Sequence, residues 1–370
     1  MRSIFKNTDY IILILALILA AIGLVGIYSA GVNSTSSDTE YIKQVIWIGI
    51  SLAVMFVVWI LDYHISSIVG IIGYPICLIL LVIVLFMPEV NGASSWFNIG
   101  PIQIQPSEFM KIAYILLLAK YIDYVFTKGK NAINKWYNLA VAVCIFIVPV
   151  LLIMLQPDFG TALVFASITF FMLFKSGLSY KYVLTLILIL IITVPLLYFF
   201  VLSEYQQERI QVFFNPEQEP LGAGYNAIQS KIAVGSGMIL GTGLGKGTQT
   251  QWGYLPVKSS DFIFSVISEE MGFVMSGLIV VIYVVLLYRI LKVAETSKDR
   301  LGAIIAIGVF GMFFFHFLEN IGMTIGLMPI TGIPLPFVSY GGSSMLTNFI
   351  ALALVLSVSS RRQKSLFIEK

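Results

Sequence analysis

Ten apolar stretches run through the chain, each long enough for an α-helix that crosses a lipid bilayer, which needs ~20 residues with a range of ~17–25. Lipid offers no hydrogen-bond partner to backbone N–H and C=O groups, so such stretches cross it as helices. The pattern predicts an all-α, polytopic integral membrane protein, with a single transmembrane domain over residues 1–370. The expected helices lie at 10–29, 43–61, 67–87, 107–125, 138–156, 159–175, 180–202, 262–291, 302–325 and 341–358.

The fifth and sixth stretches are almost continuous, and only residues 156–160, Gln-Pro-Asp-Phe-Gly, separate them. Proline lacks a backbone donor, and a carboxylate exposed to lipid is costly. We therefore expect a tight turn at this point. The first stretch has no signal-peptidase-like site, so we expect it to be retained as a helix.

Composition agrees with a membrane protein and excludes other classes. Hydrophobic residues make up 58% of the chain and charged residues 11%, which is too little polar surface for a soluble globule. The net charge of +3 is too small to indicate a nucleic-acid partner. Cys77 and Cys144 lie in apolar runs without metal-binding spacing, which argues against a disulfide or a zinc site.

The distribution of basic residues predicts the orientation of the helices. With the N-terminus inside, the segments on that side contain fifteen of the 22 Lys and Arg residues, namely Arg2, Lys6, Lys128, Lys130, Lys135, Lys175, Lys181, Arg289, Lys292, Lys298, Arg300, Arg361, Arg362, Lys364 and Lys370. Cytoplasmic loops carry such an excess. Both termini are therefore predicted to be cytoplasmic, in a multi-pass membrane protein.

One predicted extracytoplasmic loop, 203–261, is far longer than the ~12–15 residues that unstructured connections normally reach. We therefore expect it to be functional. Its glycine-rich run at 235–247 resembles a phosphate-binding loop only superficially, because no strand precedes it.

Four charged residues fall near the predicted outer ends of helices: Glu108, Lys111, Asp158 and Asp261. Structural alternatives exist for each of them. Glu108 and Lys111 have the spacing of an ion pair on one helical face, and Asp158 and Asp261 have the positions of helix caps. Outer polar residues accompany them, namely Trp96, Arg209 and Gln229. Because ionisable groups at membrane depth are costly, their convergence favours a functional site.

Two further polar groups lie near the end of the chain. His316 and Glu319 share a face of the ninth helix, next to Asn320, and form either a proton relay or an interhelical hydrogen-bond cluster. Residues 329–344 are too rich in proline and glycine to form one regular helix. Irregular backbone at membrane depth must be buried or line a cavity, so we expect a rigid wall of an outer pocket there, with Ser339 as a candidate cavity residue.

Taken together, these motifs resemble the SEDS family of RodA, FtsW and SpoVE over nearly the whole chain. The residues that carry the resemblance are Gly92-Ala93 to Trp96, Gln105-Pro106-Ser107-Glu108 to Lys111, Gln156 to Thr161, Glu208-Arg209, Gly224-Tyr225 to Gln229-Ser230, Ser260 to Phe264, Glu269 to Gly272, and Pro329 to Ser344. Short tails and the run Asn320 to Met323 look more like RodA than FtsW.

The resemblance implies a multi-pass peptidoglycan glycosyltransferase of the bacterial cytoplasmic (inner) membrane, for cell elongation and shape. Such an enzyme polymerises lipid II into glycan strands at the outer face of the membrane and releases undecaprenyl pyrophosphate. A class B penicillin-binding protein is the implied partner, alongside membrane lipids. The resemblance also implies that Asp261 is the essential acidic residue, that Trp96 is needed for polymerisation, and that Glu108, Lys111, Asp158 and Arg209 belong to polar cavity motifs.

The chemistry of such a reaction needs a base for the attacking sugar hydroxyl and cations for the leaving pyrophosphate. We take Asp261 as the base and Arg209 and Lys111 as the cations, with Lys231 and Lys246 as weaker alternatives. The sequence requires no cofactor. Magnesium or manganese, held by Asp261 with Asp158 or Glu108, is an alternative source of positive charge.

Two other functions compete with this prediction. A lipid II flippase or proton-coupled transporter would use the carboxylates and the His316/Glu319 pair as a proton path. A membrane scaffold would only recruit cell-wall enzymes, and it leaves the outer polar cluster unexplained. Polymer formation in detergent separates an enzyme from a transporter, because it needs no two-sided membrane.

Overall fold

The computed structural model describes residues 7–33, 37–88, 95–100, 102–129, 131–182, 184–185, 207 and 223–362. Within these residues nine long helices match nine of the ten predicted stretches, and the remaining stretch, 180–202, lies mostly outside them. The helices are α2 (Tyr10–Gly31), α3 (Ser37–Ile60), α4 (Tyr63–Val84), α5 (Pro106–Thr127), α6 (Trp136–Met154), α7 (Phe159–Lys175), α12 (Ile263–Glu295), α13 (Arg300–Thr324) and α14 (Gly342–Ser360).

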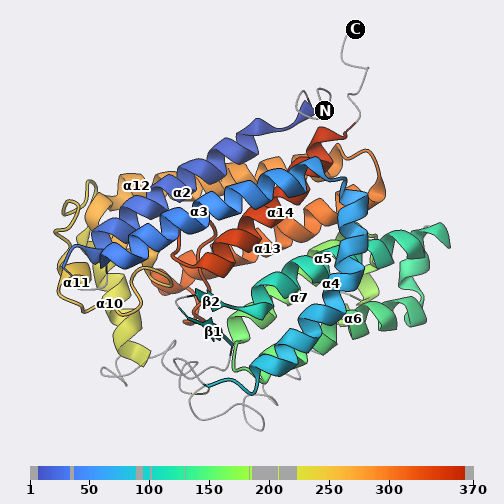
Figure 1. Cartoon of the computed structure of the whole chain (residues 1–370), viewed down its shortest axis with the longest axis horizontal. Coiled ribbons are helices and arrows are strands. Elements are labelled where there is room, and N and C mark those ends of the chain that lie inside the picture. The colour runs from blue at the N-terminus through green and yellow to red at the C-terminus, as the bar shows by residue number, and fades with distance from the viewer. Residues whose placement is uncertain are drawn as a thin grey trace.

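The helices form two groups, one of α2, α3, α12 and α14 and the other of α4 to α7, and α13 packs against members of both (Figure 1). Seven of the long helices are apolar and long enough to cross a membrane, α7 is apolar but has 17 residues, and α5 carries more charge. The predicted break between α6 and α7 is confirmed. The all-α prediction missed one short antiparallel ribbon, β1 (Phe97–Ile99) with β2 (Ile102–Ile104).

The two ends of the bundle differ. At the end that we call the terminal end, the first described residues meet the last, because the backbone N–H of Asp9 donates to Ser359 Oγ at 3.0 Å. At the opposite, loop end, the N–H of Gln105 at the start of α5 donates to Ser343 at the start of α14, at 3.2 Å. The connection between α5 and α6 also lies at the terminal end. Its Asn134 donates to the backbone oxygen of Gly177 at 3.0 Å, so the chain is again at the terminal end when α7 finishes.

From α12 onward the chain starts again at the loop end, so it changes ends between α7 and α12. The tenth predicted helix lies in this interval, mostly outside the described residues. The count of ten helices and the cytoplasmic position of the termini stay predictions.

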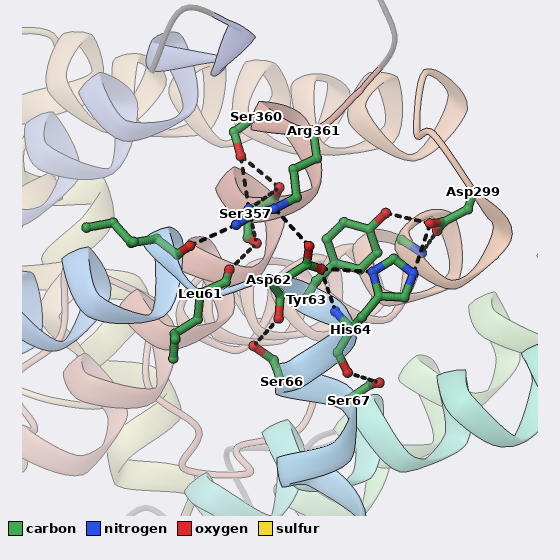
Figure 2. Close-up of polar contacts among 12 residues, drawn as sticks. Leu61, Asp62, Tyr63, His64, Ser66, Ser67, Asp299, Ser357, Ser360 and Arg361 are labelled. Carbon is green, nitrogen blue, oxygen red and sulfur yellow. Dashed lines mark hydrogen bonds and ion pairs between the residues drawn. The ribbon is translucent and has the colours of Figure 1, made fainter. Parts of the chain in front are cut away.

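At the terminal end a polar network joins the α3–α4 connection, the α12–α13 connection and the end of α14 (Figure 2). His64 lies between two carboxylates, with Nδ1 2.8 Å from Asp62 Oδ1 and Nε2 3.2 Å from Asp299 Oδ2. Arg361 Nε lies 3.2 Å from Asp62 Oδ2. Burial raises the pKa of Asp62, but the hydrogen bonds from His64 and the charge of Arg361 outweigh burial, so the pKa lies below its ordinary value.

At the loop end α12 is interrupted at Gly272, whose φ of 76° and ψ of −173° belong to a region that only glycine adopts readily. Residues 237–243 lie across this interruption. The N–H of Phe273 donates to Met238 O at 2.8 Å, so backbone groups freed by the break find partners. A Cβ on Gly272 would lie 2.3 Å from the Gly241 nitrogen.

The long loop is not unstructured where it is described. It contains α10 (Ala223–Ser236), which packs on α12 and α13, and the short α11 (Thr248–Gln251).

Candidate functional site

Residues 329–340, which we call the proline-rich segment, lie at the loop end and contain no helix or strand, as predicted. Helices distant in sequence converge on this segment. A Cβ on Gly160 at the start of α7 would lie 2.5 Å from Ile333 Cγ2. Gln44 of α3 donates from Nε2 to Ser339 O at 3.1 Å. The segment therefore connects site residues whose relative positions could not be predicted from the sequence.

Asp261 directly precedes Phe262, the N-cap residue of α12, and is partly buried. Its backbone oxygen accepts from Asn320 Nδ2 at 2.9 Å, and its Oδ1 accepts from Ser260 Oγ at 3.1 Å. The other carboxylate oxygen lies over the proline-rich segment, 3.3 Å from where a Cβ on Gly332 would stand. Asp261 is not the N-cap residue of α12, because that position is held by Phe262.

Ser339 is buried and holds the backbone that precedes Asp261. Its Oγ donates to Ser260 O at 2.6 Å and accepts from the N–H of Leu335 at 2.8 Å. Next to it, the N–H of Tyr340 donates to Ser259 O at 2.9 Å. Ser339 therefore positions the connection before α12.

Glu108 and Lys111 form an ion pair with Nζ 2.8 Å from Oε1, so this structural alternative is confirmed. The pair is almost completely buried, and Lys111 is 1% exposed. Thr347 Oγ1 of α14 donates to Glu108 Oε2 at 2.8 Å, and Lys111 Nζ lies 2.9 Å from His316 Nε2 of α13. In this structure the Lys111 ammonium faces inward, and its contact with a leaving pyrophosphate stays a prediction.

Asp158 caps α7, because its Oδ1 accepts from the N–H of Thr161 at 3.0 Å. Its Oδ2 accepts from Gln105 Nε2 at 3.2 Å. Burial raises the pKa of the Asp158 carboxyl, although the bond from Thr161 opposes this change. Asp158 therefore joins the start of α7 to the start of α5.

The three polar residues on the face of α13 all bind the proline-rich segment. His316 Nδ1 donates to Pro334 O at 3.0 Å, Glu319 Oε1 accepts from Thr331 Oγ1 at 2.8 Å, and Asn320 Nδ2 donates to Ile333 O at 2.8 Å. His316 and Glu319 thus use different partners in the segment, an arrangement that favours the hydrogen-bond cluster over the proton relay.

For the remaining predicted residues, the structure gives fewer contacts with the site. Lys231 of α10 packs against Gly326, at the start of the connection between α13 and α14. A Cβ on Gly326 would lie 1.7 Å from Lys231 Cε. Gln229 is partly buried on the same helix, and Trp96 is partly buried before β1. Arg209 lies outside the described residues.

Two buried carboxylates, Glu269 and Glu270, had no predicted role. Glu269 Oε1 accepts from the N–H of Gln249 at 2.8 Å, and its Oε2 from the N–H of Thr250 at 3.0 Å. Glu270 accepts from Ser29 Oγ of α2. These bonds anchor the loop around α11 to α12 and α2.

Among the described residues, no three or more His, Cys, Asp or Glu side chains are grouped so that they could hold a metal ion. Both oxygens of Glu108 already accept from Lys111 and Thr347. A magnesium or manganese ion held by Asp261 with Asp158 or Glu108 stays a prediction, and we derive no step through a metal.

The sequence model of the FtsW/RodA/SpoVE family, described as "Cell cycle protein", matches residues 9–364. The chain belongs to this family. The predicted resemblance is thereby confirmed, and family membership and the apolar helices make the chain a multi-pass protein of the bacterial inner membrane.

Curated relatives extend this result. The "Peptidoglycan glycosyltransferase RodA" of Treponema pallidum is 35% identical and aligns with 96% of this chain and 98% of its own. The Escherichia coli K12 "Peptidoglycan glycosyltransferase MrdB" is 38% identical, with 78% and 77% covered. The Bacillus subtilis "Stage V sporulation protein E" is 36% identical, with 95% and 97% covered. Similarity to RodA and MrdB agrees with the predicted RodA-like character.

Solved structures share the fold. One is a chain of a complex described as "Structural coordination of polymerization and crosslinking by a peptidoglycan synthase complex", with a TM-score of 0.80, 30% identity, and coverage of 95% of this chain and 97% of that chain. Another is the rod shape determining protein RodA of Thermus thermophilus, with a TM-score of 0.71, 27% identity, and coverage of 96% and 98%.

Proposed function

We propose that this FtsW/RodA/SpoVE-family protein is a peptidoglycan glycosyltransferase that polymerises lipid II into glycan strands at the outer face of the cytoplasmic membrane. The relatives named peptidoglycan glycosyltransferase align with most of the chain. The observation that carries the proposal is the carboxylate of Asp261, which is partly exposed at the loop end on a backbone fixed by Asn320.

The reaction displaces lipid pyrophosphate from an anomeric carbon by a sugar hydroxyl. The new C–O bond forms as the bond to pyrophosphate breaks, and the hydroxyl proton passes to Asp261. A fixed carboxylate suits this role, because a general base must stay within hydrogen-bond reach of the proton that it accepts. The leaving pyrophosphate needs positive charge, for which Arg209 and Lys111 are the proposed sources. The exposed Lys231 and Lys246 are the alternatives.

Lys258 is a further cation on the loop before Asp261. Its Nζ donates to Thr250 O at 2.9 Å, and burial lowers the pKa of this amine. It serves the loop around α11 rather than an open surface.

We propose a class B penicillin-binding protein as the partner that crosslinks the strands. The similar chain from a peptidoglycan synthase complex supports this proposal, because that complex coordinates polymerization with crosslinking. A transporter finds less support, since the His316/Glu319 pair binds the proline-rich segment at separate residues.

The proposal is tested by polymerisation of lipid II in detergent with the purified protein and its partner. Wild type should make glycan polymer, and Asp261→Asn should lose about 100-fold or more of the rate, the usual contribution of a general base. The control is Asp123→Asn on α5, toward the terminal end, which should keep the wild-type rate. No polymer from the wild type would refute the enzyme, whereas polymer from Asp261→Asn at the wild-type rate would refute only the base.

A further inference from the structure

His316 is a buried histidine whose ring nitrogens both have partners. It is 2% exposed. Nε2 lies 2.9 Å from Lys111 Nζ on α5, and Nδ1 lies 3.0 Å from Pro334 O in the proline-rich segment. The charged groups that face it from α5 are Lys111 and Glu108. The proposed reaction uses no atom of this ring.

These partners determine the protonation of the ring. A carbonyl oxygen only accepts, so Nδ1 carries the proton that is donated to Pro334. An ammonium only donates, so Nε2 accepts from Lys111. A second ring proton would face the Lys111 ammonium without an acceptor and would add a like charge. His316 is therefore neutral and in the Nδ1–H tautomer.

A continuous set of contacts runs from this ring to Asp261. Lys111 binds Glu108 on one side and His316 on the other, and His316 binds Pro334 O. The neighbouring carbonyl, that of Ile333, accepts from Asn320, whose Nδ2 also donates to Asp261 O. The buried ion pair and the backbone of Asp261 are thus tied to adjacent carbonyls of one segment.

We propose that His316 is a positioning residue that, as a neutral acceptor, shares Lys111 with Glu108 and fixes the proline-rich segment next to Asp261. A buried ammonium needs its partners, because an unpaired charge in a dry interior is strongly destabilising. Without His316, Lys111 loses an acceptor and Pro334 O loses its donor. The segment that supports Asp261 then has more freedom, and misplacement of a catalytic group lowers the rate.

The protonation state is directly measurable, because the chain has only 2 histidines, His64 and His316. Full-length protein labelled with ¹⁵N-histidine gives two imidazoles, and His64→Gln leaves only His316. Its nitrogen shifts should show the neutral Nδ1–H tautomer throughout about pH 5 to 8, the range in which an ordinary histidine titrates. An imidazolium or an Nε2–H tautomer in this range would overturn the proposal.

The positioning role rests on the proposed function and is read in polymerisation of lipid II. His316→Leu removes both hydrogen bonds and should lower kcat about 10- to 100-fold with KM unchanged. His316→Gln, whose amide reaches the region of Nε2, supplies an acceptor to Lys111 and should recover part of the loss. His316→Asn, whose amide reaches the region of Nδ1, supplies a donor to Pro334 O. It should recover the part of the lost kcat that depends on this second bond.

Rates are normalised to the folded fraction of each variant, so a folding defect alone does not lower them. Wild-type kcat in His316→Leu, or equal losses in the Leu, Gln and Asn variants, would contradict the positioning role. Failure of the proposed function is distinguishable, because wild type would then make no polymer while the nitrogen shifts of His316 stay as expected.

Discussion

Asn320→Leu is the substitution that tests most directly whether α13 supports the site. Asn320 is 0% exposed, and its Nδ2 donates to Asp261 O at 2.9 Å and to Ile333 O at 2.8 Å. Leucine has nearly the shape of asparagine but donates nothing. The substitution therefore leaves these carbonyls without that donor and opens no large cavity.

The expected cost follows from the acceptors that lose a partner. Each buried acceptor left unsatisfied costs about 1–3 kcal/mol, so the pair costs about 2–6 kcal/mol, partly offset by the apolar side chain. The matched control is Asn138→Leu at the start of α6. Asn138 is 4% exposed, and its Nδ2 donates to Ala132 O at 2.7 Å, far from the site at the terminal end. The control should lose about 1–3 kcal/mol.

Both variants are measured in the same detergent, by unfolding and by polymerisation of lipid II per folded molecule. Asn320→Leu should be the less stable of the two and should also lose activity, because the backbone of Asp261 is released. Asn138→Leu should lose stability but keep wild-type activity when folded. Equal activity losses in the two variants, or none in Asn320→Leu, would refute a specific link between α13 and Asp261.

Two further outcomes concern stability. In thermal unfolding, Gly272→Ala should destabilise the protein by about 2–4 kcal/mol, because the positive φ costs about 1–3 kcal/mol and the added Cβ meets backbone atoms. The control is Gly277→Ala in α12, where the added Cβ would meet open space, and this variant should be neutral or slightly stabilising. The lowered pKa of Asp62 means that its contribution is complete above about pH 4 and is lost as pH falls through the lower folded pKa. Asp62→Asn should therefore flatten the fall of the melting temperature in acid, and an unchanged acid profile would contradict this assignment.

The helices were predictable because length and apolar composition are local properties. The break at 156–160 was predictable for the same reason, since proline and a carboxylate act where they stand in the chain. The ribbon β1–β2 was not predictable, because strands of 3 residues are too short to show an alternating pattern.

The partners of the polar residues were only partly predictable. Spacing correctly paired Glu108 with Lys111, which lie on one helix. The same rule placed His316 and Glu319 on one face but could not identify Lys111 and Thr331 as their partners, because these come from other elements. Helical spacing defines a face, and only the packing of helices decides what that face meets.

The proline-rich segment gives a physical reason for the polar face of α13. Backbone that is not helical leaves carbonyls without intrahelical partners, and at membrane depth water cannot replace them. Ile333 and Pro334 receive donors from Asn320 and His316, and Pro336 receives one from Tyr283 of α12. The side chains that make irregular backbone tolerable are thus the ones that connect it to Asp261 and Lys111. A substitution that removes such a donor should therefore affect folding and polymerisation together, in a proportion set by its distance from Asp261.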